Sequence, residues 1–234
     1  MTDPRVAIIT GASRGLGRAL ARRLAVDGWA LVLDARGDAA LQTIERELAQ
    51  ITRVRSVTGD VRDAAHQAAL MAAARELGGL DAVVNNASVL GPSPQPRLAE
   101  YPLDELSYVY DVNTLAPLAL TQRALPSLRA RNGIVVNITS DAAVEPYEGW
   151  GGYGSSKAAL EQLGNILGAE EPDVHVYTFD PGDMRTQMHQ DAFPGEDISD
   201  RPEPESVVPA LLRLLETKPA SGRYRAADLV AVAS

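Results

Sequence analysis

The sequence predicts an α/β fold: a single three-layer domain in which a doubly wound, mostly parallel sheet lies between two layers of helices. Short apolar runs rich in β-branched residues alternate along the chain with longer stretches of helical periodicity. This alternation is typical of a parallel sheet with helices on both faces. The chain has 234 residues, 45% of them hydrophobic, which is enough to bury a substantial core. We therefore expect residues 1–234 to form one domain.

The first strand is expected at residues 5–10, an apolar run that is too short for a core helix. Similar runs predict strands at residues 30–33, 54–57, 82–84, 133–139 and 174–179. Apolar residues at helical spacing predict helices at residues 18–27, 38–50, 63–77, 103–129, 153–169 and 205–215. Pro117 is expected to kink the long helical region or to mark an irregular turn in it. The proline-rich segments 91–96 and 194–204 are expected to be surface loops.

Composition excludes several classes of protein. The absence of cysteine excludes disulfides, thiolate metal sites and a cysteine nucleophile, and it suits a reducing cytoplasm. A net charge of −9 argues against a nucleic-acid surface. No apolar stretch is long enough to span a membrane and the first residues lack a signal-peptide core, so we expect a cytoplasmic protein. His66, His175 and His189 are too scattered for a metal site, and each is expected at the surface or in a loop.

A glycine-rich turn separates the first strand from the first helix. It reads Thr10-Gly11-Ala12-Ser13-Arg14-Gly15-Leu16-Gly17. Backbone N–H groups at a helix start attract anions, and missing side chains let a phosphate come close. The spacing differs from the usual G-x-G-x-x-G pattern, so the turn alone could be simple loop chemistry.

Tyr153 and Lys157 form the most informative pair in the chain. Residues four apart in a helix share one face, so the ammonium group is expected near the phenol. A free tyrosine has a pKa of about 10, and a nearby cation moves that pKa toward the working pH of an acid-base catalyst.

Together the two motifs resemble the short-chain dehydrogenase/reductase family, in its single-domain branch with the Rossmann fold. Further landmarks of that family occur in order over residues 5–226: Asp60-Val61, Asn85-Asn86-Ala87-Ser88, Asn113, Ser140 and Pro181-Gly182. Ser88 stands where the family usually has glycine, a departure that puts only local loop geometry in doubt. The resemblance implies an NAD(P)(H)-dependent oxidoreductase that interconverts an alcohol and a ketone or aldehyde by hydride transfer.

The resemblance also implies the catalytic roles. Tyr153 would be the general acid-base, and Lys157 would lower its pKa and hydrogen-bond the nicotinamide ribose. Ser140 would polarise the substrate oxygen. Asn113 would hold a helix irregularity and a water that links Lys157 to solvent. Cofactor-binding residues carried over in the same way are Gly11, Ser13, Arg14, Gly15, Leu16, Gly17, Arg36, Asp60, Val61, Asn86, Ala87, Tyr153, Lys157, Pro181, Gly182 and Thr186.

Cofactor choice depends on the end of the second strand. In NAD-preferring relatives an acidic residue there binds the ribose hydroxyls and repels a 2′-phosphate. That position falls on Ala35, with Asp34 directed away by strand alternation. Arg36 and Arg14 would then face the phosphate, so NADP(H) is expected over NAD(H). A one-residue shift would instead bring Asp34 to the ribose and favour NAD(H).

The substrate is expected to be a small carbonyl or alcohol compound, bordered by residues 141–150 and 183–201, with a substrate loop at about residues 183–204. A non-catalytic dinucleotide-binding sensor is the alternative function, and it would lack the Tyr, Lys or Ser. Enoyl reduction is a third reading, which the Tyr-to-Lys spacing disfavours. No nucleic-acid or membrane partner is expected. A homodimer or homotetramer is expected because the helical regions around Asn113 and Tyr153 have apolar residues on more than one face: Leu115, Leu118, Leu120, Leu160, Leu163 and Leu167.

Overall fold

The structure is a computed structural model that describes residues 4–230. Residues 1–3 and 231–234, the two ends of the predicted domain, lie outside the described part. The strands form one seven-stranded parallel sheet in the order β3-β2-β1-β4-β5-β6-β7. Their bounds are β1 (Val6–Ile9), β2 (Ala30–Ala35), β3 (Val54–Thr58), β4 (Ala82–Asn85), β5 (Ile134–Ile138), β6 (His175–Asp180) and β7 (Gly222–Arg225). The predicted doubly wound α/β fold is confirmed.

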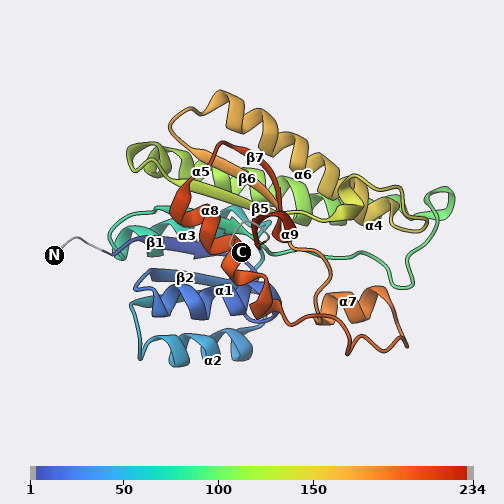
Figure 1. Ribbon diagram of the computed structural model, residues 1–234, viewed down its shortest axis with the longest axis horizontal. Coiled ribbons are helices and arrows are strands. Elements are labelled where there is room, and N and C mark those ends of the chain that lie inside the picture. Colours follow the sequence, from blue (N-terminus) through green and yellow to red (C-terminus); the bar gives the residue numbers. More distant parts are fainter. Residues whose placement is uncertain (1–3, 231–234) are drawn as a thin grey trace.

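Helices cover both faces of the sheet (Figure 1). The α-helices are α1 (Gly15–Val26), α2 (Asp38–Leu48), α3 (Ala64–Glu76), α4 (Leu103–Tyr110), α5 (Ala116–Ala130), α6 (Gly151–Glu170), α7 (Gln187–Ala192), α8 (Val208–Thr217) and α9 (Ala226–Val230). Short 3-10 turns lie at Leu98–Glu100, Asp141–Ala143 and Pro204–Ser206. A π-helical segment, Asp111–Leu115, joins α4 to α5, so the predicted irregularity lies just before Pro117.

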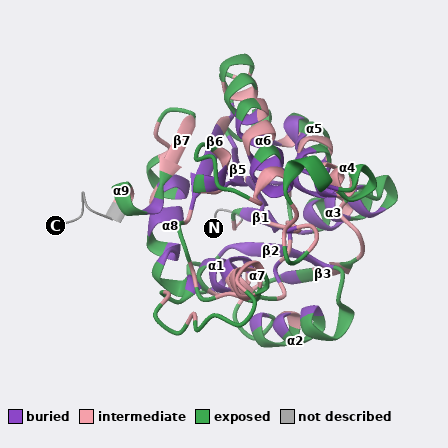
Figure 2. Cartoon of the chain, turned by 90° about the vertical axis from the view of Figure 1, so that its right-hand side faces the viewer, coloured by how far each residue is buried: buried purple, intermediate pink, exposed green. Residues whose placement is uncertain are grey.

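The core has two halves, one on each side of the sheet. Side chains of α1, α2 and α8 pack on one face, and those of α3 and α5 pack on the other. Residues of β2 alternate between the halves: Leu31, Leu33 and Ala35 face α1 and α2, whereas Ala30 and Val32 face α3. The residues coloured as buried in Figure 2 lie mainly along the strands and on parts of the helices that cover them. Asp34 lies two residues after Val32, so its side chain also points to the α3 side of the sheet.

Several elements differ from those predicted. Helix α1 begins at Gly15 rather than at residue 18, because the Arg18 N–H already donates to the Arg14 carbonyl oxygen at 3.3 Å. Strand β7 and helix α7 were not predicted, and α7 lies within the region expected to be the substrate loop. In the part of the chain that is described, no helix combines the length and apolar character needed to cross a membrane.

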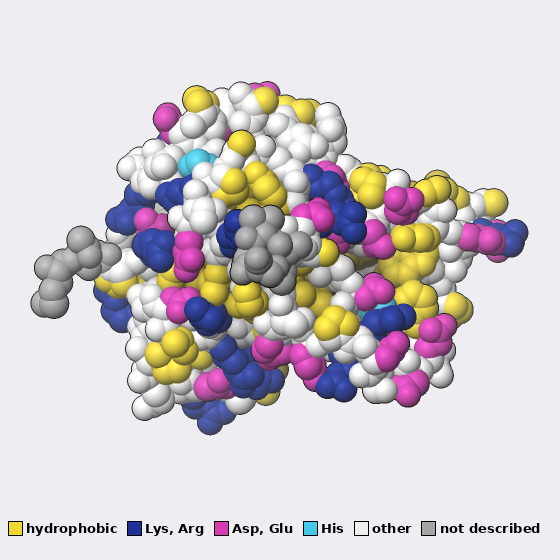
Figure 3. Space-filling view, in the orientation of Figure 1, with side chains coloured by type: hydrophobic (Ala, Val, Ile, Leu, Met, Phe, Trp, Pro, Cys, Tyr) yellow, Lys and Arg dark blue, Asp and Glu magenta, His cyan; other side chains and the backbone are white. Residues whose placement is uncertain are grey.

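The histidine prediction was wrong for His66. Its side chain is 5% exposed on α3 and contacts Asp34. His175 begins β6 and His189 lies in α7, both half-buried. Within residues 4–230, His, Asp and Glu side chains do not gather into a metal-binding group. Acidic and basic side chains are interspersed with hydrophobic patches over the face seen in Figure 3.

Candidate active site

A cavity of about 1010 Å³ opens at the carboxyl ends of the strands, where ligands bind in open α/β sheets. It extends from the turn after β1 to the segments around α7. Most of the predicted site residues line it together: Gly11, Ser13, Arg14, Gly15, Leu16, Arg36, Asp60, Val61, Asn86, Ala87, Ser140, Tyr153, Lys157, Pro181, Gly182 and Thr186. Gly17 and Asn113 do not line the cavity but lie behind its wall.

The glycine turn forms a backbone floor for one end of the cavity. Gly11 and Gly15 have φ values of 65° and 55°, a region that favours glycine. Arg14 is the N-cap of α1, and no side chain caps that helix, so its first N–H groups remain available to an anion. A Cβ on Gly15 would lie 3.6 Å from Thr186 Cγ2, which places the start of α7 over the turn.

Asn86 locks this turn to the end of β4. Its Nδ2 donates to the carbonyl oxygens of Thr10 and Gly11 at 2.8 and 3.2 Å. The Thr10 hydroxyl in turn accepts from the backbone N–H groups of Asn86 and Ala87, both at 3.0 Å. Gly17 packs into the same joint, since a Cβ there would lie 2.6 Å from Asn86 Nδ2. Asn86 and Gly17 therefore shape the turn.

The end of β2 carries positive charge. Arg36 lines the cavity and donates from Nη1 to the Tyr108 hydroxyl at 3.0 Å, a neutral partner. Arg14, Arg18 and Arg22 line the same end. Arg18 and Arg22 contact Glu47, whereas among the described residues neither Arg14 nor Arg36 has a carboxylate within ion-pair distance.

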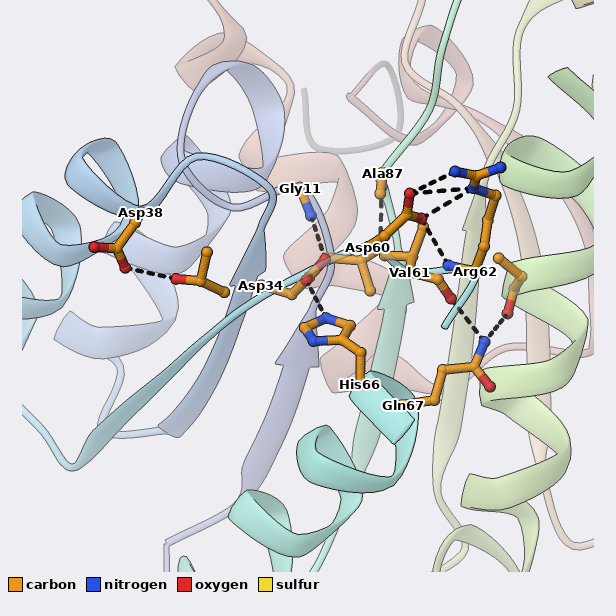
Figure 4. Close-up of polar contacts among 12 residues, drawn as sticks. Gly11, Asp34, Asp38, Asp60, Val61, Arg62, His66, Gln67 and Ala87 are labelled. Carbon is orange, nitrogen blue, oxygen red and sulfur yellow. Dashed lines mark hydrogen bonds and ion pairs between the residues drawn. The ribbon is translucent and has the colours of Figure 1, made fainter. Parts of the chain in front are cut away.

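The carboxylates of Asp60 and Asp34 lie at this end (Figure 4). The Arg62 guanidinium binds both oxygens of Asp60 at 2.8–3.1 Å, and these hydrogen bonds lower the pKa of that carboxyl. The Asp34 carboxylate faces His66 on the α3 side.

Tyr153 lies near the other end of the cavity on α6 and is buried. Burial raises its pKa above the usual value, the carboxylates of Asp141 and Asp180 add to the rise, and hydrogen bonds with Ser88 and Ser140 oppose it. Ser140 lies two residues after β5, at the N-cap of the 3-10 turn Asp141–Ala143, and donates from Oγ to Asp141 Oδ1 at 2.9 Å. Tyr153 and Ser140 therefore converge from two elements on one point of the cavity.

Lys157 lies beside the Tyr153 ring, with Nζ 5.5 Å from the ring centroid. Its Nζ donates to the Ile138 carbonyl oxygen at 2.8 Å. Burial lowers the pKa of Lys157 to about 7. For Tyr153, burial acts against the downward shift of the pKa that the sequence predicts, and it is the largest influence on that group.

Asn113 occupies the π segment and is completely buried. Its Oδ1 accepts from Ser88 Oγ and Val89 N, and its Nδ2 donates to the Val89 carbonyl oxygen and Ser156 Oγ, all at 2.9–3.0 Å. These bonds fix the segment after β4 against α6. Ser88, which stands where glycine was expected, therefore has two specific partners: it donates to Asn113 Oδ1 and is hydrogen-bonded to Tyr153.

An aromatic wall, formed by Trp150, Phe193 and His189, lies beside Tyr153. The Trp150 ring lies 5.8 Å from both the Tyr153 and the Phe193 rings, measured between centroids, and His189 lies 4.9 Å from Phe193. Met188 lines the cavity beside them. The two segments that the sequence predicted to border the substrate do line the cavity.

A partly buried ion-pair network packs behind Ser140. Arg223 of β7 donates from Nη2 to Asp180 Oδ2 at 2.8 Å and to the Ser140 carbonyl oxygen at 3.4 Å, and its Nη1 binds Glu161. Sequence reasoning missed Arg223, because β7 was not predicted. It also missed Arg18 and Arg22, whose i, i+4 spacing just after the glycine turn was a usable signal.

Comparison with known proteins agrees with this geometry. The family model for short chain dehydrogenase matches residues 5–197. Sepiapterin reductase of Meriones unguiculatus is 39% identical over 199 residues, which cover 79% of this chain and 76% of the relative. Benzil reductase ((S)-benzoin forming) of Saccharomyces cerevisiae is 35% identical over 196 residues, covering 80% of this chain and 74% of that protein.

A solved structure is also similar over nearly the whole chain. The alcohol dehydrogenase of the archaeon Thermococcus sibiricus, complexed with 5-hydroxy-NADP, has a TM-score of 0.85 and 32% identity, covering 94% of this chain and 95% of that chain. This chain therefore belongs to the short-chain dehydrogenase family, and it is an NAD(P)(H)-dependent oxidoreductase that interconverts alcohols with ketones or aldehydes.

Proposed function

We propose that this enzyme reduces ketones with NADP(H), using Tyr153 as the general acid. The observation that carries the proposal is the convergence of Tyr153, Ser140 and Lys157 on the cavity that also contains the glycine turn. When bound, the nicotinamide supplies the hydride that reaches the carbonyl carbon. The protein must therefore orient the carbonyl and deliver one proton to its oxygen.

Each residue has a separate task. The Tyr153 hydroxyl gives its proton to the substrate oxygen as that oxygen gains charge, and solvent restores the proton after the turnover. The Ser140 hydroxyl orients the same oxygen. Lys157 places an ammonium group beside Tyr153 and toward the cavity, where it can bind a ribose hydroxyl and favour the phenolate that remains. Asn113 holds the Ser88 segment and α6 in register.

The residues at the glycine turn fit a dinucleotide. Gly11 and Gly15 line the cavity without side chains, and the uncapped start of α1 offers N–H donors for a pyrophosphate. Asp60 and Val61 would contact the adenine, Ser13 and Leu16 the phosphates, and Ala87, Pro181, Gly182 and Thr186 the nicotinamide half.

The NADP(H) preference rests on charge at the end of β2. Arg14 and Arg36 would bind a 2′-phosphate, a charge-assisted contact worth about 1.5–3 kcal/mol per hydrogen bond. Ala35 puts no carboxylate at the position where NAD-preferring relatives have an acid. The related alcohol dehydrogenase that was solved with 5-hydroxy-NADP supports this direction.

The aromatic wall favours ketones that carry an aromatic ring. Trp150, Phe193 and His189 can stack on such a ring while its carbonyl lies at Tyr153. A related protein is named benzil reductase ((S)-benzoin forming), which supports the same substrate class.

We also propose one domain over residues 1–234, with residues 183–204 as the substrate loop, in a cytoplasmic homodimer or homotetramer. Leu115 and Ile166 are 53% and 45% exposed on neighbouring elements. Between them, half-buried Leu118, Leu163 and Leu167 line a shallow groove of α5 and α6. A second copy packing on this face would bury them. Leu120 and Leu160, counted in the sequence argument, instead belong to the core of the subunit.

A substrate screen with both cofactors tests the function. Purified enzyme would be mixed with a panel of aromatic and aliphatic ketones and either NADPH or NADH, and the nicotinamide absorbance followed. We expect the highest kcat/KM with NADPH and an aryl ketone. A higher kcat/KM with NADH would refute the cofactor preference, and oxidation of neither cofactor with any ketone would refute the proposed reaction.

A further inference from the structure

Asp34 is a buried acid that the catalytic mechanism does not use. Its side chain is 1% exposed although it lies at the edge of the cavity. Oδ1 is 2.6 Å from His66 Nε2, and Oδ2 accepts from Gly11 N at 3.4 Å (Figure 4). Burial raises the pKa of Asp34, and the contact with His66 opposes that rise. Such a carboxylate is strongly destabilising without a partner.

His66 is fitted closely to this position. It comes from the first turns of α3, and its ring reaches under the ends of β2 and β3. Gly59, just after β3, leaves the required space, because a Cβ there would lie 2.3 Å from His66 Nδ1. The His66 side chain is itself 5% exposed. The imidazole therefore holds the Asp34 carboxylate on the α3 side of the sheet.

The direction of the Asp34 side chain matters for cofactor choice. Asp34 precedes Ala35 and Arg36 in the chain, and Arg14, Arg36 and Asp60 line the cavity at this end. An Asp34 carboxylate turned into the cavity would neutralise Arg36 and repel a 2′-phosphate. It would also offer the two acceptor oxygens that ribose hydroxyls require.

We propose that His66 is a selectivity-determining positioning residue: by holding Asp34 beneath the glycine turn, it keeps the end of β2 selective for a 2′-phosphate. This inference rests on the proposed NADP(H) preference. His66 touches no ligand itself and acts only through Asp34. The sequence Leu33-Asp34-Ala35-Arg36 thus carries both an acid and an arginine. Strand alternation directs the acid to the α3 side of the sheet, and the hydrogen bond with His66 holds it there.

Equilibrium binding of nucleotide fragments tests this without turnover. The affinities of 2′,5′-ADP and of ADP would be measured by calorimetry for the wild type and for His66→Leu, which fills the space but donates no hydrogen bond. We expect the ratio of the two affinities to fall by about tenfold in His66→Leu, as one carboxylate turns toward the phosphate. His175→Ala, which removes a histidine outside the cavity, should leave the ratio unchanged.

Two further variants separate charge from packing. His66→Leu combined with Asp34→Asn should recover the wild-type ratio, because the freed side chain is then neutral. Asp34→Asn alone should change the ratio by less than about twofold, since the carboxylate is already held away. This variant retains His66, so it also tests the idea if His66→Leu does not fold.

The outcomes are distinct. A His66→Leu variant that keeps the wild-type ratio, or that weakens both fragments equally, would show a merely structural role and overturn the inference. So would a large rise in the ratio for Asp34→Asn alone, because Asp34 would then already be acting on the ligand. A wild type that does not prefer 2′,5′-ADP would instead refute the proposed NADP(H) preference before any variant is examined.

Discussion

Tyr153 and Lys157 are both buried, and burial disfavours the charged form of each side chain. For the tyrosine this means a protonated phenol over the whole neutral range. For the lysine it means a pKa of about 7, so that both of its forms are populated near neutrality. A protonated phenol is the form that can give a proton to a carbonyl oxygen, which suits reduction.

The direction of the Tyr153 shift predicts different pH profiles for the two directions of reaction. Carbonyl reduction uses the phenol, so its kcat/KM should not fall between about pH 7 and pH 9 through Tyr153. Alcohol oxidation uses the phenolate, which becomes more abundant as pH rises toward a raised pKa, so its rate should increase throughout that range. Steady-state rates in both directions check this, and an oxidation rate that peaks below neutral pH would contradict it.

Single residues also mark the limit of prediction from sequence. Tyr153, Ser140 and the glycine turn were predicted because they occur in a fixed order along the chain. The contact between Asp34 and His66 was not, and His66 was wrongly expected in a loop or at the surface. The burial of His66 depends on Gly59 before α3 and on Asp34 at the end of β2. The spacing of these three residues in the sequence does not show that they meet.

At the scale of elements, the glycine turn fixes α1 against the ends of β1 and β4. Gly17 is the closest point of this packing, where a Cβ would lie 2.6 Å from both Asn86 Nδ2 and the Gly11 carbonyl oxygen. Gly37, at the N-cap of α2, has open space around it and a negative φ. Replacing Gly17 and Gly37 by alanine in separate variants therefore distinguishes the effect of steric crowding from the general effect of replacing a glycine.

We predict that Gly17→Ala lowers the free energy of unfolding by about 1–3 kcal/mol, the usual cost of overpacking. Gly37→Ala should change it by less than about 1 kcal/mol, because no atom blocks the methyl group. Urea unfolding followed by circular dichroism gives both values. Equal losses in the two variants would show that the contact with Asn86 does not limit the packing of α1.

The long helices and the central strands were predicted from periodicity, whereas the short elements were not. Strand β7 reads Gly222-Arg223-Tyr224-Arg225, without the β-branched residues that signal a strand, and it lies at the sheet edge. Helix α7 has six residues and no buried stripe. Its position depends on Thr186, which caps the helix by accepting from His189 N at 3.2 Å.

At the scale of the whole molecule, the exposed apolar face of α5 and α6 predicts assembly. Ile166→Glu should convert the proposed oligomer to a monomer, because it would place a charge in the centre of a buried interface. Val26→Glu on α1, which is 68% exposed, is the matched control and should leave the mass unchanged. Light scattering at micromolar concentration gives the mass of each variant in solution. A wild-type monomer, or an Ile166→Glu variant of unchanged mass, would refute the interface.

The central claim is that Tyr153 gives the proton to the substrate oxygen in the cavity that binds the nicotinamide. The most direct test is a single-turnover measurement of NADPH oxidation by the Tyr153→Phe variant with an aryl ketone found active in the screen, alongside the equilibrium binding of NADPH. The account predicts a rate lower by roughly 10²–10⁴-fold, the usual contribution of a general acid, with NADPH affinity close to that of the wild type. A variant that turns over at near the wild-type rate would contradict it.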